Sequence, residues 1–174
     1  DGVSPRILAA TIIAALDPRR RTGQGQYIDA AQLEMSLHYL SPQIMDYSTS
    51  GRSVTRNGNG SQYFAPQGAY PCAGDDQWCT IAVETAEQWE GLQRSMGSPA
   101  WAQDAKFGSM EGRLENHDAI DQHIGEWTKD QEPAALMQLL LSHGVPAGVV
   151  QRSSDLKSDP QLAHRNYFRH LEHQ

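Results

Sequence analysis

The chain has 174 residues and a formal net charge of −7, from 14 lysines and arginines against 21 aspartates and glutamates. This length suits one medium-sized domain, or a small domain with part of another, and it is long enough to bury a core without covalent cross-links. The acidic balance argues against a nucleic-acid partner and against an anionic membrane surface.

The first predicted helix starts close to the beginning of the chain. Ser4 is a capping residue type, and Pro5 fits the first helical position, where its missing N–H costs nothing. The segment "RILAATIIAAL" that follows is apolar on nearly every face, so we expect a helix that is buried on all sides. The helix is predicted to end before Asp17 and Pro18, because proline disfavours helix in the residue ahead of it.

A second helix is predicted over residues 30–47, after the turn "RTGQGQ". Asp29 is its expected cap, and Pro42 should kink it. Its apolar residues fall on one stripe, formed by Leu33, Leu37, Leu40 and Ile44. Residues 48–62, "STSGRSVTRNGNGSQ", are polar and rich in turn-forming residues, which is typical of a linker.

After this linker the sequence period changes to two. "GAYPC" and "WCTIAV" flank "AGDDQ", which predicts a β-hairpin over residues 68–83. A capping box of Thr85 and Gln88 then predicts a helix start. This helix is expected to bury Trp89, Leu92 and Met96 and to stop at Gly97. A further helix is predicted over 110–127, with Leu114, Ile120, Ile124 and Trp127 pointing inward. Another is predicted over 132–143 and is expected to end at His143 and Gly144. The last predicted elements are a short buried strand in "PAGVV", a capped turn in "SDPQLAH" and a strand in "YFRHLEHQ".

These elements predict two bodies in an α/β fold. Residues 1–47 are interpreted as a helical part of a large domain and residues 48–61 as a linker. Residues 62–145 have their own hairpin, helices and core residues, and are interpreted as a small α+β domain. Residues 146–174 are interpreted as a linker and a return toward the large domain. Because both ends look like pieces of a second body, we expect the chain to start and stop inside a larger fold.

Cysteine usage and hydropathy indicate the compartment. Cys72 and Cys79 are expected on the two arms of the hairpin as free, half-buried thiols, which is typical of a reducing environment. No apolar run approaches the ~18 residues needed to span a bilayer. The apolar stretch from Ile7 to Leu16 has no basic leader before it, unlike a signal peptide. The sequence therefore predicts a cytoplasmic protein without a membrane partner.

Seven histidines raise the question of a metal site. They form no His-x-x-x-His pair, and none stands in a Cys-x-x-Cys context, so no metal site is predicted. His143 is interpreted as the C-terminal cap of a helix. Asp75 and Asp76 are paired carboxylates, but they fall at the expected hairpin tip, where water screens both, and acid–base chemistry is not expected there.

Two other features are candidates for chemistry. Asp1 precedes the first helix, whose unsatisfied N–H groups and positive dipole end favour an ionised carboxylate. A carboxylate held there can serve as a nucleophile or a base, or it can simply cap the helix. Gly58 and Gly60 lie in "RNGNGSQ", whose backbone can reach positive φ and form an anion-binding nest, or can serve as a flexible linker. The segment matches neither a P-loop nor a GxGxxG turn.

Four motifs, in order, carry a family resemblance. "AALDPRRRTGQGQYIDAAQLE", "APQGAYPCAGDDQWCTIAV", "HGVPAGVV" and "DPQLAHRNYF" resemble the class III CoA-transferase family, which includes formyl-CoA:oxalate and crotonobetainyl-CoA:carnitine CoA-transferases. The similarity covers essentially the whole chain in unbroken order. It implies part of a Rossmann-like large domain plus a small α+β domain, in a homodimer whose two chains are interlocked.

The resemblance also implies a mechanism. In the family the catalytic aspartate stands a few residues before the helix that leads to an "R-x-x-TG-x-GQ" turn. Asp1 stands at that place, and Arg19, Thr22 and Gly23 follow at the family's spacing. Asp1 would attack an acyl-CoA thioester, giving a mixed anhydride and then an aspartyl-CoA thioester, from which a small carboxylic acid collects the CoA. No permanently bound cofactor or metal is then needed.

Two departures from the family pattern leave alternatives open. Oxalate-type enzymes have a run of consecutive glycines over the catalytic aspartate, whereas "GNGSQ" stands here. Oxalate specificity is therefore not carried over, and Gly58 and Gly60 are candidate substrate-binding residues only. The α-methylacyl-CoA racemases also look similar, use the matching aspartate as a base and present a glutamate near Glu84. An acyl-CoA racemase and a non-catalytic fragment are the alternatives to a transferase.

Overall fold

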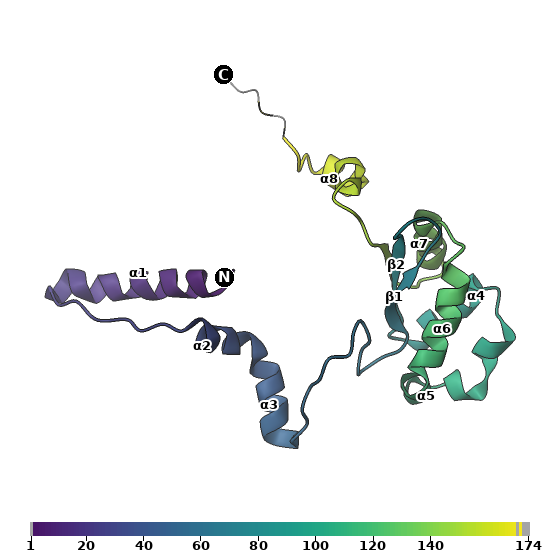
Figure 1. The fold of residues 1–174 in the computed structure, drawn as a ribbon, viewed down its shortest axis with the longest axis horizontal. Coiled ribbons are helices and arrows are strands. Elements are labelled where there is room, and N and C mark those ends of the chain that lie inside the picture. The colour runs from purple at the N-terminus through teal and green to yellow at the C-terminus, as the bar shows by residue number, and fades with distance from the viewer. Residues whose placement is uncertain (1, 170, 172–174) are drawn as a thin grey trace. The chain divides into compact units, whose positions relative to one another are not determined.

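The structure is a computed structural model that describes residues 2–169 and residue 171 (Figure 1). The chain divides into two compact units, Asp1–Arg56 and Asn57–Gln174. The architecture is a mixed α/β fold with a small three-stranded sheet, so the general fold class is confirmed. The division into a Rossmann-like large domain and a small domain, with the boundaries given above, stays a prediction.

The first unit begins with α1 (Ser4–Thr22). The helix runs through Pro18 and ends where Gly23, at φ 74°, donates its N–H to the carbonyl oxygen of Arg19 at 2.9 Å. The predicted end before Asp17 is therefore wrong. The internal proline removes one backbone hydrogen bond, but the helix continues past it. A left-handed glycine cap then ends the helix.

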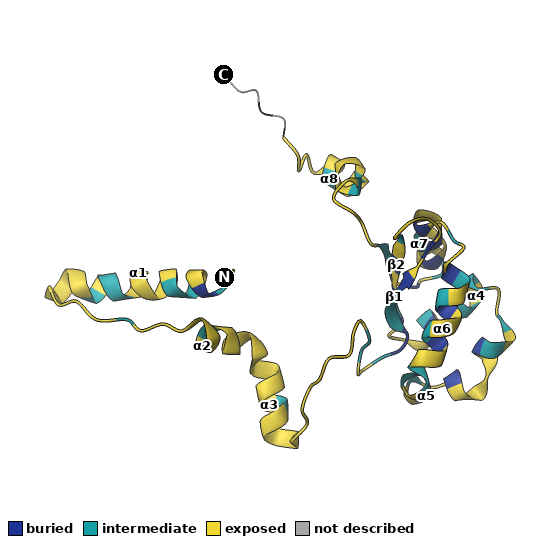
Figure 2. Cartoon of the chain, viewed as in Figure 1, coloured by how far each residue is buried: buried dark blue, intermediate teal, exposed yellow. Residues whose placement is uncertain are grey.

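The expected burial of α1 on all sides is also wrong for the chain as it stands. Ile13 is 69% exposed, and most of the helix is yellow in Figure 2. Within the first unit, α2 contacts α1 but leaves most of its apolar residues exposed. The sequence pattern identifies a surface that is fit for burial, but burial needs a partner that packs against it.

The second predicted helix is divided into three. It comprises α2 (Gln32–Leu37), a 3₁₀ turn (His38–Leu40) and α3 (Ser41–Ser50). The residue before α2 is Ala31 and not Asp29, and its side chain makes no capping bond. Pro42 occupies the first turn of α3, where its missing N–H is tolerated. The predicted interruption at this proline is confirmed, while the apolar stripe is exposed, with Leu33 at 74%.

The second unit is built on a three-stranded antiparallel sheet. Its strands are β1 (Gln67–Pro71), β2 (Trp78–Ala82) and β3 (Ala147–Val149), in the order β1-β2-β3. Tyr70 pairs with Cys79, and Thr80 pairs with Gly148. The predicted hairpin is confirmed. The strand predicted in "PAGVV" also forms, as β3. It is only half-buried, because it lies at one edge of the sheet.

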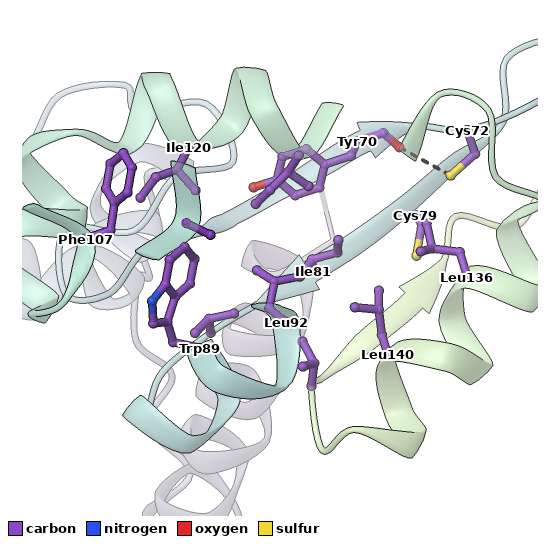
Figure 3. Packing of buried hydrophobic residues seen from close by; sticks show 14 residues of the cluster. Tyr70, Cys72, Cys79, Ile81, Trp89, Leu92, Phe107, Ile120, Leu136 and Leu140 are labelled. Carbon is purple, nitrogen blue, oxygen red and sulfur yellow. Dashed lines mark hydrogen bonds between the residues drawn. The ribbon is translucent and has the colours of Figure 1, made fainter. Parts of the chain in front are cut away.

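Helices cover one face of this sheet. They are α4 (Ala86–Ser95), α5 (Met110–Glu115), α6 (His117–Thr128) and α7 (Pro133–Ser142). Every second strand residue points into the core, as Tyr70, Cys79 and Ile81 do (Figure 3). The helices contribute Trp89, Leu92, Ile120, Ile124, Leu136 and Leu140 to the same core, and the 3₁₀ turn before α5 contributes Phe107. Two further 3₁₀ turns, Ala100–Gln103 and Ala105–Phe107, link α4 to α5.

Several predicted helix ends are confirmed. The Thr85 hydroxyl accepts the Gln88 N–H at 3.3 Å, and the Gln88 side chain accepts the Thr85 N–H at 3.2 Å, which completes the capping box. His143 caps α7, and its Nδ1 lies 3.1 Å from the carbonyl oxygen of Leu139. The helix predicted over 110–127 is instead two helices that meet at Asn116, whose φ of −118° is not helical.

The C-terminal segment contains two short turns. They are a 3₁₀ turn (Asp155–Ser158) and α8 (Pro160–His164), where the Asp159 side chain accepts the Leu162 N–H at 2.8 Å. This predicted capped turn is confirmed. The predicted strand over 167–174 is wrong for residues 167–169 and 171, which form no strand. The rest of that segment lies outside the described residues.

Gly91 in α4 lies very close to the backbone that follows α7. A Cβ built there would overlap the carbonyl oxygen of His143 and lie 3.1 Å from a methyl group of Val145. We expect Gly91→Ala to lower the free energy of unfolding by about 1–3 kcal/mol. Urea denaturation followed by tryptophan fluorescence measures this, because all four tryptophans belong to the second unit.

The matched control is Gly125→Ala in the interior of α6. A Cβ at Gly125 would have its nearest neighbour, the Cδ of Pro71, at 4.0 Å. This substitution is expected to stabilise the unit by up to about 1 kcal/mol, since alanine loses less backbone entropy than glycine in a helix. Equal losses of stability in the two variants would contradict the packing described here.

The two cysteines are free thiols, as predicted, and they are fully rather than half buried. Cys72 donates its S–H to the carbonyl oxygen of Tyr70 at 3.8 Å (Figure 3). Burial raises the pKa of the Cys79 thiol to about 11. At pH 8 both cysteines are therefore expected to react with iodoacetamide at least about a hundredfold more slowly in the native protein than in 8 M urea. Mass spectrometry of timed samples measures this, and equal rates would contradict the burial.

Candidate functional site

A pocket of about 630 Å³ lies in the second unit, over the sheet face that the helices leave open. Its strand residues include Ala69, Thr80 and Gly148, whose positions alternate with those that point into the core. Small side chains therefore leave room above the middle of the sheet. The volume falls within the range of roughly 300–1,000 Å³ that is typical of small-molecule sites.

The glycine-rich segment lines the same pocket. Gly58, Asn59 and Gly60 all contribute to the lining. Gly58 has φ 54°, and the Gly60 N–H donates to the carbonyl oxygen of Asn57 at 3.0 Å, so the segment forms a tight turn. The Gln67 side-chain amide donates to the carbonyl oxygen of Asn59 at 2.8 Å and ties this turn to β1. Both glycines singled out from the sequence thus lie at a pocket, while their role there stays a prediction.

The lining of the pocket is electrically neutral. It comprises Gly58, Asn59, Gly60, Gln67, Gly68, Ala69, Thr80, Ile81, Ala82, Pro146, Ala147 and Gly148. The Thr80 hydroxyl donates to the carbonyl oxygen of Gly148 at 3.1 Å. A ligand in this pocket therefore meets amide, hydroxyl and backbone groups together with small apolar surfaces, and among these described residues it meets no formal charge.

The sequence predicted the glycine turn of this pocket but not the residues of the sheet that line it. Gln67, Thr80 and Gly148 carry no recognisable motif. One signal was present: the outward positions of the predicted hairpin hold Ala69, Thr80 and Ala82, which are too small to fill the space above a sheet.

Asp1, the predicted nucleophile, lies outside the described residues. The helix that follows it is described, and Arg6 and Ile7 both donate their backbone N–H groups to the carbonyl oxygen of Val3, at 3.0 and 3.3 Å. Glu84, the residue of interest for a racemase, is exposed after β2, and its backbone N–H donates to Gln88. The pocket and Asp1 belong to different units.

A tyrosine–carboxyl pair lies on the other side of the sheet, in the core. The Tyr70 hydroxyl donates to Asp121 in α6 at 2.6 Å. Burial raises the pKa of Asp121, and burial together with this hydrogen bond raises the pKa of Tyr70 far above its usual value. The pair therefore connects α6 to β1 and faces away from the pocket.

Hydrogen bonds hold the hairpin tip in place. Asp76 accepts a hydrogen bond from the indole of Trp78 at 2.8 Å. Arg152 donates to the backbone carbonyl oxygens of Asp75 and Asp76, which fastens the segment after β3 to the tip. Both carboxylates are exposed, as predicted.

The described residues contain no group of three or more histidine, cysteine, aspartate or glutamate side chains placed to hold a metal ion. Their helices include none with both the length and the apolar character needed to cross a membrane.

The architecture has a match among solved structures. A CaiB/BaiF family protein from Brucella suis superposes with a TM-score of 0.79 at 31% identity, and the match covers 94% of this chain and 43% of that one. The fold therefore places the chain with CaiB/BaiF-type proteins.

The sequence comparisons agree with this placement. The profile of CoA-transferase family III matches residues 1–174, and the chain belongs to that family. A probable CoA-transferase of Mycobacterium tuberculosis is 32% identical over 99% of this chain. The succinyl-CoA–D-citramalate CoA-transferase of Chloroflexus aurantiacus is 30% identical over 95% of this chain. The matched regions span 22% and 41% of the length of these two relatives.

Proposed function

We propose that the protein acts in CoA transfer, moving CoA from an acyl-CoA thioester to a carboxylic acid. The match of CoA-transferase family III to the entire chain carries this proposal. The similarity to enzymes named as CoA-transferases, among them one that uses succinyl-CoA, supports it. A cytoplasmic location, an interlocked homodimer and the lack of a permanently bound cofactor belong to the same proposal.

The proposed chemistry runs through Asp1. Its carboxylate attacks the thioester carbon, and CoA leaves as the thiolate, which gives a mixed anhydride between Asp1 and the acyl group. The thiolate then attacks the aspartyl carbonyl, releases the donor acid and forms an aspartyl-CoA thioester. The acceptor carboxylate repeats the sequence in reverse and leaves with the CoA. Each step exchanges one activated acyl bond for another, so the cycle balances without ATP.

The position of Asp1 before α1 supports its assignment. The first turn of a helix presents N–H groups without partners and a positive dipole end, which stabilise negative charge near them. The same groups can stabilise an oxyanion that develops on the reacting carbonyl. Gly58 and Gly60 are proposed to contact substrate, because they line the pocket over the sheet.

A transfer assay tests this function in the full-length gene product. The enzyme is incubated with succinyl-CoA and a panel of mono- and dicarboxylic acids in deuterated water, and chromatography detects any new CoA thioester. Transfer without deuterium at the α-carbon supports the proposal. Deuterium exchange without transfer would contradict it and favour an acyl-CoA racemase in which Asp1 acts as a base. A folded protein that does neither would contradict it in favour of a non-catalytic role.

A further inference from the structure

The turn at residues 57–60 contains two asparagine–glycine pairs, in the segment "RNGNGSQ". Asparagine is a chemically labile residue, because the backbone nitrogen of the following residue can attack its side-chain carbonyl carbon. A following glycine favours this attack, since it has no Cβ to hinder the nitrogen and its backbone rotates freely. The other two asparagines of the chain precede His117 and Tyr167, whose side chains obstruct the attack. The two pairs are therefore the candidate sites of modification.

The first pair meets the structural requirements for this reaction. Asn57 and Gly58 are both exposed, and no described residue accepts a hydrogen bond from the Gly58 N–H. Apart from its chain neighbours, no described atom lies within 4 Å of a Cβ built at Gly58. The backbone therefore has room to bring the Gly58 nitrogen to the Asn57 side chain.

The second pair is restrained through the peptide group that joins its two residues. The Gly60 N–H donates to the carbonyl oxygen of Asn57 at 3.0 Å, so its nitrogen is engaged in the turn. The carbonyl oxygen of Asn59 accepts a hydrogen bond from the Gln67 side chain at 2.8 Å, which fixes the same peptide group from its other side. Attack at Asn59 requires that these hydrogen bonds break first, whereas the Gly58 N–H is free from the start.

We infer that Asn57 is a site of spontaneous deamidation and isomerisation, and that Asn59 is protected from the same reaction. The Gly58 nitrogen forms a bond to the side-chain carbonyl carbon of Asn57. The bond from that carbon to its amide nitrogen breaks, and ammonia leaves with the Gly58 proton. Water then opens the resulting succinimide ring at either carbonyl group, which gives aspartate or isoaspartate. The steps together consume one water molecule and release one ammonia molecule, so the reaction balances with solvent alone.

The modification changes the pocket that the turn lines. Aspartate or isoaspartate at residue 57 places a negative charge directly before Gly58, beside a lining that carries no formal charge. Isoaspartate also adds a methylene group to the main chain at the residue whose carbonyl oxygen accepts the Gly60 N–H, so the turn loses its geometry. The pocket therefore changes as the protein ages, and this conclusion does not depend on the proposed function.

Timed mass spectrometry of the full-length gene product tests the inference. Native protein and a sample in urea are kept in mildly alkaline buffer, digested at mildly acidic pH, and fragmented so that aspartate and isoaspartate are distinguished at each position. In the native protein Asn57 should react at least about threefold faster than Asn59, because the N–H that Asn59 needs is hydrogen-bonded. In urea the two rates should agree within about twofold, since unfolding removes the turn. Equal native rates, or an Asn57 that stays intact while the urea sample reacts, would overturn the inference.

A matched pair of variants tests the protection of Asn59. Gln67→Met removes the donor to the Asn59 carbonyl oxygen and keeps the length of the side chain, so the rate at Asn59 should rise by at least about twofold. Gln138→Met makes the same change at an exposed position of α7 and should leave the rates at both asparagines unchanged. An equally slow reaction of Asn59 in both variants would contradict its protection by Gln67.

Discussion

Replacement of Asp1 by asparagine is expected to lower the rate of CoA transfer by about 10³- to 10⁶-fold in the full-length gene product. The amide keeps the size of the side chain but cannot form the mixed anhydride, and the loss of a covalent nucleophile typically costs this much. Steady-state rates with succinyl-CoA and the best acceptor acid measure the effect. The KM for acyl-CoA should change far less than kcat, because the carboxylate acts in the chemical step.

The control for this variant lies in the helix that follows. Asp17→Asn makes the same change in α1, where Asp17 is exposed and pairs with Arg21 at 2.8 Å. An exposed pair of this kind contributes about 0–1 kcal/mol to stability, so the Asp17 variant should retain full activity. An Asp1 variant that keeps more than about a tenth of the wild-type rate would be inconsistent with a covalent role for Asp1.

Arg113→Met is expected to lower the free energy of unfolding of the second unit by about 2–5 kcal/mol. Arg113 is 2% exposed and donates to the carbonyl oxygens of Ala65 at 2.9 Å and Phe107 at 3.1 Å. Both acceptors belong to buried residues. Methionine fills similar space but leaves two buried carbonyl groups without these partners, at about 1–3 kcal/mol each. Urea denaturation followed by tryptophan fluorescence measures the change.

Arg94→Met provides the comparison for Arg113. Arg94 is exposed on α4 and forms a loose ion pair with Glu90 at 3.7 Å, so its replacement should change stability by less than about 1 kcal/mol. Arg113→Lys should fall between the two, since lysine keeps the charge without the planar fork that reaches both carbonyls. A loss below about 1 kcal/mol for Arg113→Met would refute the structural role assigned to this guanidinium.

The elements that the sequence predicted well depend on interactions between near neighbours in the chain. The hairpin follows from alternating apolar residues around a turn, and the capping box follows from Thr85 and Gln88, three positions apart. Gly97 and Gly144 end helices at positive φ, as their positions predicted. The physical reasons for these elements are local, so the sequence alone contains them.

The elements that the sequence predicted poorly depend on distant partners. An arginine in a predicted helix, such as Arg113, is expected at the surface. Only the fold brings its guanidinium to the carbonyl oxygen of Ala65. The apolar face of α1 was predicted to be buried, although a pattern cannot tell what packs against it. In the pocket, the glycine turn follows from a recognisable sequence motif. The open sheet face depends instead on small side chains, which form no motif.

The proposed mechanism depends most directly on a covalent bond at Asp1. Full-length protein is mixed with acyl-CoA in the absence of acceptor, treated with hydroxylamine or borohydride, digested and analysed by mass spectrometry. We expect a hydroxamate or a reduced side chain on the peptide that contains Asp1, and no such product when Asp1 is replaced by asparagine. Unmodified Asp1 in a protein that transfers CoA would contradict it.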